Sequence, residues 1–287
     1  MLSYKHAFHA GNHADLIKHI VLTFAIDLYT RKDKPFVYID SHAGSGIYNL
    51  SEKESNTTGE YKLGIKKLQE FNGIKKLCGS YFSVIDKINA NGDFSMYPGS
   101  PYIAQTLLRE NDQMIFMELH NTEFEKLHRN FSRDQRCHIH HRDGFEGLIA
   151  LTPPTPRRGL TLIDPSYEMK EDYRNTVDAV EKLVKRWNVG CVIIWYPLLS
   201  GSKDHSLYMH ESFRKMNIKN SFTVRLCPFF SGDENVRMYG SAVTVLNAPY
   251  MLLNKVKEIL PELHEALKQS DKARSVIEVY SQDTEPI

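Results

Sequence analysis

Asp164-Pro165-Ser166-Tyr167 follow an apolar run and carry the groups needed to activate an aromatic amine. The exocyclic amine of adenine is a poor nucleophile because its lone pair is delocalised into the ring. A carboxylate and a backbone carbonyl that accept its two hydrogens would direct that lone pair towards an electrophile. Asp164 offers the carboxylate, Pro165 offers a carbonyl in a rigid turn, and Tyr167 could stack on an extruded base. By itself the motif also occurs as a strand-ending turn.

Three other acidic positions follow predicted strands. Residues 40–46 read Asp-Ser-His-Ala-Gly-Ser-Gly, whose small residues let the backbone pass close to a nucleotide-like ligand. Glu118 could accept both hydroxyls of a ribose, and Asp143 could accept from an adenine amine. Taken singly, residues 40–46 suit a tight turn without a ligand. Glu118 could instead cap the next helix, and Asp143 could be a turn residue. Their joint placement predicts a nucleoside site, whereas the absence of GxGxxG disfavours NAD.

The N-terminal segment is rich in Tyr, Lys and His, including Tyr4, His6 and Lys18. His9 and His13 are four residues apart and could share a helix face as metal ligands. No cysteine or further carboxylate completes a ligand set, so we predict no metal site. Such a mixture at the mouth of a cofactor site suits phosphate contact and base stacking better.

Apolar runs separated by helical patterns predict the scaffold that holds these residues. The runs predict seven strands, at 36–40, 114–118, 137–141, 160–164, 191–196, 222–227 and 241–246. Helical spacing covers 15–31, 122–131, 172–187 and 203–216. This alternation predicts a mostly parallel sheet covered on both faces. The last two strands are too close for a helical crossover and should pair antiparallel.

The stretch between the first two strands is longer than one crossover helix requires. Residues 50–94 contain helical patterns and predict a small helical insertion. The crossover helix should begin at Ser100-Pro101, because serine can cap a helix and proline suits its first turn. The expected domains are therefore 1–49 with 95–287, in which residues 1–14 form an N-terminal motif, and the insertion at 50–94.

Composition limits the function classes. The chain has 287 residues, 41% hydrophobic and 25% charged, with a formal charge of +1. The net charge is too small to attract a polyanion to the whole molecule, so a nucleic-acid site must be a local patch. Neither a signal-peptide pattern nor an apolar run of membrane-spanning length is present, which predicts a cytoplasmic protein without membrane attachment. Nothing indicates an obligate protein partner.

Taken together, these motifs resemble the RlmJ family, the 23S ribosomal RNA (adenine-N6)-methyltransferases. The likeness covers nearly the whole chain and rests on residues 1–15, 40–46, 97–101, 118–120, 143–145 and 157–160. It implies an α/β, Rossmann-like class I methyltransferase fold, with a seven-stranded mostly parallel sheet, a last antiparallel strand and a small helical insertion. It also implies S-adenosylmethionine as cofactor and 23S ribosomal RNA as partner.

The resemblance implies a role for particular residues. Asp164 is the expected catalytic acceptor, with Pro165 and Tyr167 beside it, and Tyr4, His6 and Lys18 are expected to contact RNA. The cofactor site is expected to comprise His19, His42, Ser100, Glu118, Asp143, Gly144 and Asp164. The family has Asp-Pro-Pro-Tyr where this chain has Ser166.

Two alternative functions remain open at this point. The first is a DNA adenine-N6 methyltransferase, because the catalytic residues do not distinguish the two polymers. The second is a non-catalytic nucleic-acid-binding or DNA-utilisation accessory protein, which Ser166 and the near-neutral charge favour. A complete donor site would remain unexplained in an accessory protein.

Overall fold

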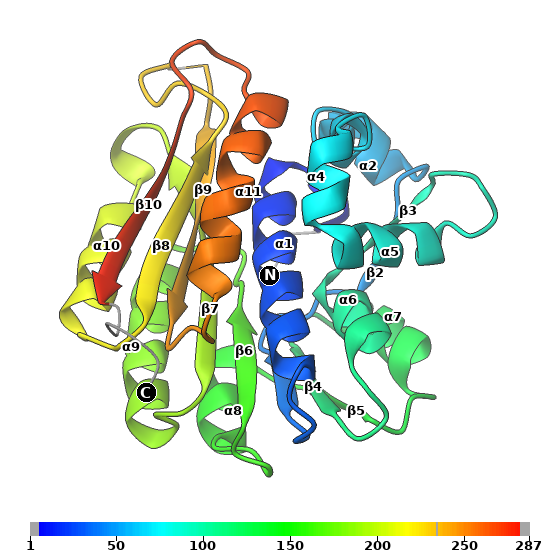
Figure 1. Cartoon of the computed structure of the whole chain (residues 1–287), viewed down its shortest axis with the longest axis vertical. Helices are drawn as coiled ribbons and strands as arrows, with labels where there is room; N and C mark the ends of the chain where they lie inside the picture. Colours follow the sequence, from blue (N-terminus) through cyan, green and yellow to red (C-terminus); the bar gives the residue numbers. More distant parts are fainter. Residues whose placement is uncertain (1–5, 234, 282–287) are drawn as a thin grey trace.

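An eight-stranded sheet organises the molecule (Figure 1). The computed structural model describes residues 6–233 and 235–281. Across the sheet the strands are β10 (Arg274–Ser281), β8 (Ser221–Cys227), β9 (Met238–Leu246), β7 (Cys191–Leu199), β6 (Gly159–Ile163), β1 (Val37–Asp40), β4 (Gln113–Glu118) and β5 (Cys137–His141). Strands β7, β6, β1, β4 and β5 run parallel. Strand β9 is antiparallel to both β7 and β8.

The predicted Rossmann-like class I fold is confirmed, including the antiparallel pairing of β8 with β9. The sheet has one strand more than the seven predicted, because β10 pairs antiparallel with β8 at the edge. Every residue of β10 is exposed or half-buried, and Arg274 and Glu278 interrupt its apolar positions. An edge strand of this kind lacks the continuous apolar run by which the other strands were predicted.

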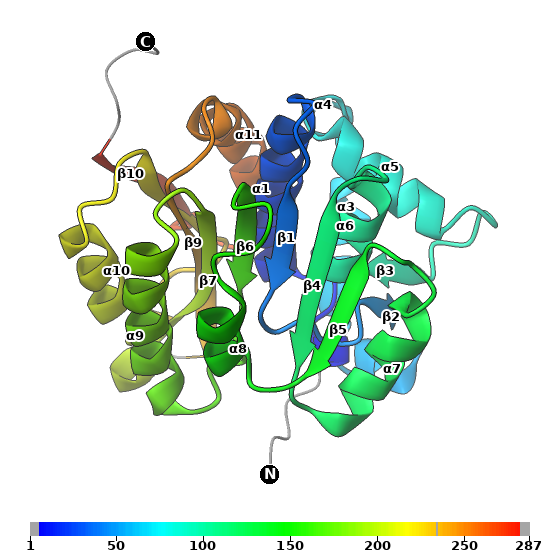
Figure 2. The same ribbon diagram turned by 90° about the horizontal axis from the view of Figure 1, so that it is seen from below.

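Helices cover both faces of the sheet (Figure 2). One face carries α1 (His13–Thr30), α6 (Ser100–Leu107), α7 (Asn121–Phe131) and α11 (Leu252–Leu267), and the other carries α8 (Gly144–Leu151), α9 (Lys170–Arg186) and α10 (Ser206–Lys215). Side chains of β1 alternate between the faces, so Tyr38 packs with the α1 layer while Val37 and Ile39 pack with the α9 layer. The first strand is therefore buried on both sides.

Helix α1 runs through the most enclosed layer. Its first turn is capped by Asn12, whose side chain accepts from the Ala14 and Asp15 amides at 2.9 and 3.1 Å. Sheet, insertion and α11 surround the helix, and only three of its eighteen residues are not buried. Polar side chains on α1 consequently face other side chains instead of water.

Short helices fill the predicted insertion. They are α2 (Lys53–Thr58), η2 (Glu60–Lys62), α3 (Ile65–Leu68), α4 (Asn72–Leu77) and α5 (Gly79–Ile88). Ile65, Leu68 and Tyr81 pack in the same hydrophobic cluster as α1. A two-stranded ladder, β2 (Ile47–Asn49) with β3 (Met96–Pro98), closes the insertion, and three-residue strands are too short to show a periodic pattern. The division into two domains stays a prediction.

The remaining short elements are η1 (His6–Phe8) and η3 (Gly201–Lys203). The crossover helix α6 begins at Ser100 with Pro101 in its first turn, as predicted. Within the described part of the chain, no helix combines the length and apolarity needed to cross a bilayer.

Candidate functional site

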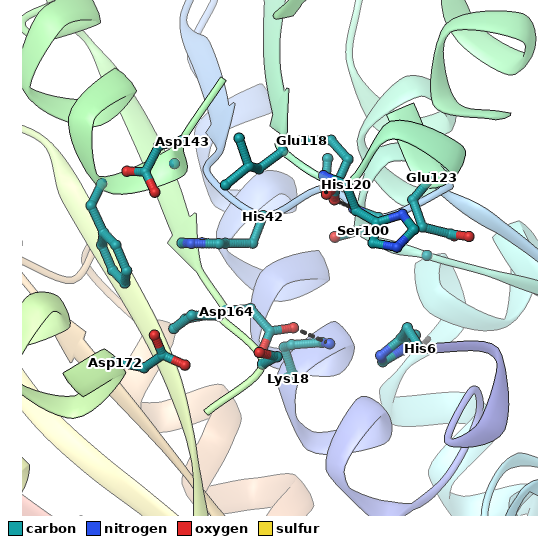
Figure 3. Close-up of a pocket in the computed structure, with 18 of the residues that line it drawn as sticks. His6, Lys18, His42, Ser100, Glu118, His120, Glu123, Asp143, Asp164 and Asp172 are labelled. Atoms are coloured by element: carbon teal, nitrogen blue, oxygen red, sulfur yellow. Dashed lines mark hydrogen bonds and ion pairs between the residues drawn. The ribbon is translucent and has the colours of Figure 1, made fainter. Parts of the chain in front are cut away.

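A cavity of about 170 Å³ opens where β1, β4 and β6 end and α8 begins. Figure 3 shows Glu118, His42 and Asp143 on one side of it and Asp164, Lys18 and His6 on the other. Ten of the predicted site residues line this first cavity: His6, Lys18, His19, His42, Ser100, Glu118, Asp143, Gly144, Asp164 and Pro165. The expected joint placement is observed for Glu118, Asp143 and Asp164. Asp40 does not line this cavity, because it is fully buried and accepts from the Tyr38 hydroxyl at 2.7 Å.

Glu118 braces the glycine turn that follows β1. Its carboxylate accepts from the amides of Gly44 at 2.8 Å and His120 at 2.7 Å. Gly44 has φ of 59°, a left-handed conformation that suits glycine. Burial raises the pKa of the Glu118 carboxyl, although the backbone donors act to lower it. Glu118 therefore joins the ends of β1 and β4 at the cavity wall.

The Asp143 carboxylate caps a helix, and the residue also lines the cavity. One carboxylate oxygen accepts from the Glu146 amide at 2.9 Å and caps α8, whereas the simpler interpretation expected only a turn residue. The residue also lines the cavity. Next to it, a Cβ on Gly144 would lie 2.0 Å from the Ser41 carbonyl oxygen, so only glycine allows this approach between α8 and the turn.

Several lining residues were not predicted. Leu119 and Phe145 are adjacent in sequence to the predicted Glu118 and Gly144, and Leu119 is 47% exposed. The Phe145 ring lies 4.9 Å from that of His42. Apolar side chains on either side of a nucleoside site commonly enclose the base. Both residues could have been identified from the sequence, because each is adjacent to a predicted site residue.

The ammonium of Lys18 lies between two carboxylates. Its Nζ is 2.5 Å from Asp164 Oδ2 (Figure 3) and 2.8 Å from Asp15 Oδ1. Asp15 also accepts from the Gly11 amide and faces His6 Nε2, both at 2.9 Å. Burial acts to lower the pKa of Lys18, but the two carboxylates raise it above its usual value. Lys18 is 4% exposed and lines both this cavity and a second one beside it, and its predicted contact with RNA stays a prediction.

Tyr167 turns its ring into the protein. It is 7% exposed, has φ of 51°, and its hydroxyl donates to the Trp195 carbonyl at 2.9 Å. The ring contacts that of Tyr173 at a centroid distance of 4.7 Å. Tyr167 is absent from the first cavity but lines a second one. Stacking of a base on Tyr167 stays a prediction.

The second cavity, of about 570 Å³, adjoins the first. Both are lined by His6, Lys18, Asp164 and Ser166. Asp164 therefore stands where a ligand in one cavity could meet a ligand in the other.

The N-terminal histidines do not share a helix face, contrary to the spacing argument, because α1 begins only at His13. His9 Nδ1 instead bonds Glu60 at 3.0 Å. Among residues 6–233 and 235–281, no group of three or more potential ligands is placed to hold a metal. The predicted RNA contact Tyr4 lies outside the described residues.

The comparisons with known proteins decide the family. The model described as "Ribosomal RNA large subunit methyltransferase D, RlmJ" matches residues 33–279. The chain belongs to the RlmJ family. Proteins named ribosomal RNA large subunit methyltransferase J from Escherichia coli (strain K12) and Haemophilus influenzae are 38% and 40% identical to it. These alignments cover 93% of this chain and 94% of each relative.

A solved structure extends the likeness to three dimensions. A crystal structure of a Legionella pneumophila protein matches this chain with a TM-score of 0.84 at 34% identity. The match covers 94% of this chain and 98% of that one. The RlmJ chain described here therefore keeps this fold over nearly its whole length.

The buried histidines predict that the free energy of unfolding decreases as the pH is lowered. Burial lowers the pKa of His42 to about 4, below the value of about 6.5 for an unfolded histidine. Below pH 6.5 the unfolded state therefore binds the extra proton, and the free energy of unfolding decreases as the pH falls towards 4. Urea denaturation of His42→Gln should show a loss between pH 7 and 5 smaller by about 2 kcal/mol than in wild type. His138→Gln, at an exposed position, is the control; equal losses in all three proteins would contradict the burial argument.

Proposed function

We propose that this protein transfers the methyl group of S-adenosylmethionine to the N6 amine of an adenine in 23S ribosomal RNA, in the cytoplasm and without an obligate protein partner. The observation that carries the proposal is the position of Asp164 at the junction of two cavities. Membership of the RlmJ family and the names of its curated relatives support the substrate class.

The first cavity fits the donor by the chemistry of its walls. Glu118 would accept the ribose hydroxyls and Asp143 the adenine amine, while Leu119 and Phe145 would enclose the base. Gly144 leaves the space that a side chain would fill. His19, His42 and Ser100 complete the wall. When bound, S-adenosylmethionine supplies an electrophilic methyl group.

The acceptor side depends on Asp164 and Pro165. Lys18 occupies Oδ2 of Asp164, which leaves Oδ1 to accept a hydrogen from the target amine. The carbonyl of Pro165 would accept the second hydrogen. Together they orient the nitrogen lone pair, and the carboxylate stabilises the positive charge that develops on nitrogen. Lys18 acts as a positioning residue because it holds the carboxylate in place.

Methyl transfer to protein-free RNA tests the proposal. The purified chain, radiolabelled S-adenosylmethionine and unmodified 23S ribosomal RNA should yield N6-methyladenine at a defined position. DNA of the same sequence is the control, since preference for DNA would favour the first alternative. Tight donor binding without transfer to either polymer would favour the accessory-protein alternative.

Glu118→Ala should weaken S-adenosylmethionine binding by roughly 1.5–3 kcal/mol for each charge-assisted hydrogen bond lost. The physical reason is the loss of the proposed ribose acceptor. Isothermal calorimetry measures the effect, with Glu125→Ala on the exposed side of α7 as control. A folded Glu118→Ala protein with wild-type affinity would remove Glu118 from the donor site.

Ser166→Pro restores the motif found in the family and should leave donor affinity unchanged. Turnover should change only modestly, because the proposed carbonyl belongs to Pro165. Steady-state transfer rates measure this effect. A folded Ser166→Pro protein without activity would mean that the loop uses another geometry.

A further inference from the structure

The second cavity is longer than a single base requires. Asp164 and Tyr167 follow β6 at one end, and Phe229 follows β8 at the other. Strands β6, β7, β9 and β8 lie side by side in the sheet (Figure 1), so the ends are three strand spacings, or about 14 Å, apart. Stacked bases are separated by only about 3.4 Å. An adenine held at Asp164 therefore leaves the far end of the cavity free.

The far end offers an aromatic platform. Phe229 and His13 both line it, with ring centroids 6.0 Å apart and an edge-on angle of 66°. Burial lowers the pKa of His13 to about 4, so its ring is neutral at pH 7. Its Nδ1 is buried and has no hydrogen-bond partner among the described residues. A neutral imidazole that braces a phenyl ring provides a surface on which a base can stack.

Arg237 supplies positive charge beside this platform. It lines the same cavity and is exposed, and no carboxylate of residues 6–233 or 235–281 forms an ion pair with it. The nearby Glu60 is occupied, since it bonds His9 at 3.0 Å and Asn12 at 2.8 Å. An exposed guanidinium next to an aromatic ring is the combination that contacts a phosphate and its base.

We propose that His13, Phe229 and Arg237 form a pocket for the nucleotide adjacent to the target adenine in a single-stranded segment of RNA. Its base stacks on Phe229 and its phosphate contacts Arg237. This inference rests on the proposed methylation of RNA and names the second nucleotide that the enzyme holds. Two adjacent nucleotides that are base-paired in a helix could not occupy both ends of the cavity. The target segment must therefore be unpaired or opened.

A double-mutant cycle between protein and RNA tests the stacking contact. The substrates are a 23S ribosomal RNA fragment that carries the methylated adenine and two derivatives without the base on its 5′ or 3′ side. Phe229→Ala should raise KM for the intact fragment about 5- to 150-fold, the factor for one stacked base, with S-adenosylmethionine affinity unchanged. One abasic fragment should raise the wild-type KM similarly. Combining it with Phe229→Ala should add nothing further.

Phe230→Ala is the matched control, because Phe230 is 37% exposed, lies next to Lys272 and does not line the second cavity. Arg237→Gln is a second probe that keeps Phe229 intact. It should raise KM. It should also reduce the slope of log KM against log salt concentration by about 1, the contribution of one phosphate contact. Arg214→Gln, on α10, controls for loss of a surface arginine.

The outcomes separate the two proposals. Wild-type transfer to the fragment with a KM unaffected by Phe229→Ala and Arg237→Gln overturns the flanking-nucleotide pocket and leaves the methyltransferase proposal standing. Multiplicative effects of Phe229→Ala and both abasic fragments also overturn the stacking contact. If wild type transfers no methyl group to the fragment, the proposed function fails and the pocket fails with it.

Discussion

Asp164→Asn should reduce methyl transfer to RNA at least about a hundredfold while S-adenosylmethionine binding is retained. Asparagine keeps the shape of the side chain but removes the charge that offsets the positive nitrogen. It also leaves Lys18 with Asp15 as its remaining carboxylate partner. Single-turnover transfer with saturating donor isolates this step from binding.

Asp178→Asn is the matched control, because Asp178 lies at an exposed position on α9. It should transfer at the wild-type rate. A folded Asp164→Asn protein that transfers as fast as this control would exclude Asp164 as the acceptor of the amine hydrogen.

Lys18→Met should decrease the free energy of unfolding by about 3–5 kcal/mol, the usual effect of removing one partner from a buried ion pair. Asp15 is 1% exposed and would be left as a buried carboxylate without its ammonium partner. Urea denaturation of the protein without ligand measures the change. Lys126→Met breaks a partly exposed pair with Glu123 and should cost no more than about 1 kcal/mol.

A second substitution separates charge from lost packing. Asp15→Asn together with Lys18→Met removes the ammonium and its more deeply buried carboxylate partner, while Asp164 keeps its charge, and should recover part of the stability lost in Lys18→Met. A double variant as unstable as the sum of its single variants would show that Lys18 stabilises the fold through its aliphatic chain instead.

The acids of the site could be predicted because of where parallel strands end. Glu118 and Asp164 terminate or follow apolar runs, and strand ends of a parallel sheet meet at one edge. Asp143 was found by the same rule, although its capping of α8 was not predicted. These positions needed only the order of the elements.

Contacts between distant segments could not be predicted in this way. Lys18 pairs with a carboxylate 146 residues away, and no periodic pattern encodes that distance. Nothing in the sequence therefore indicated the buried ion pair, whereas the predicted contact of Lys18 with RNA stays a prediction. The inward ring of Tyr167 likewise depends on Trp195, a residue of another strand. Strand β10 was missed because its partner β8, and not its own composition, defines it.

Comparison of 23S ribosomal RNA from cells with and without this gene tests the central claim most directly. Nuclease digestion and mass spectrometry of the RNA should reveal one N6-methyladenine that is absent from the deletion strain. Expression of the wild-type chain should restore it, and expression of Asp164→Asn should not. Identical adenine methylation of 23S ribosomal RNA in the two strains would contradict the account.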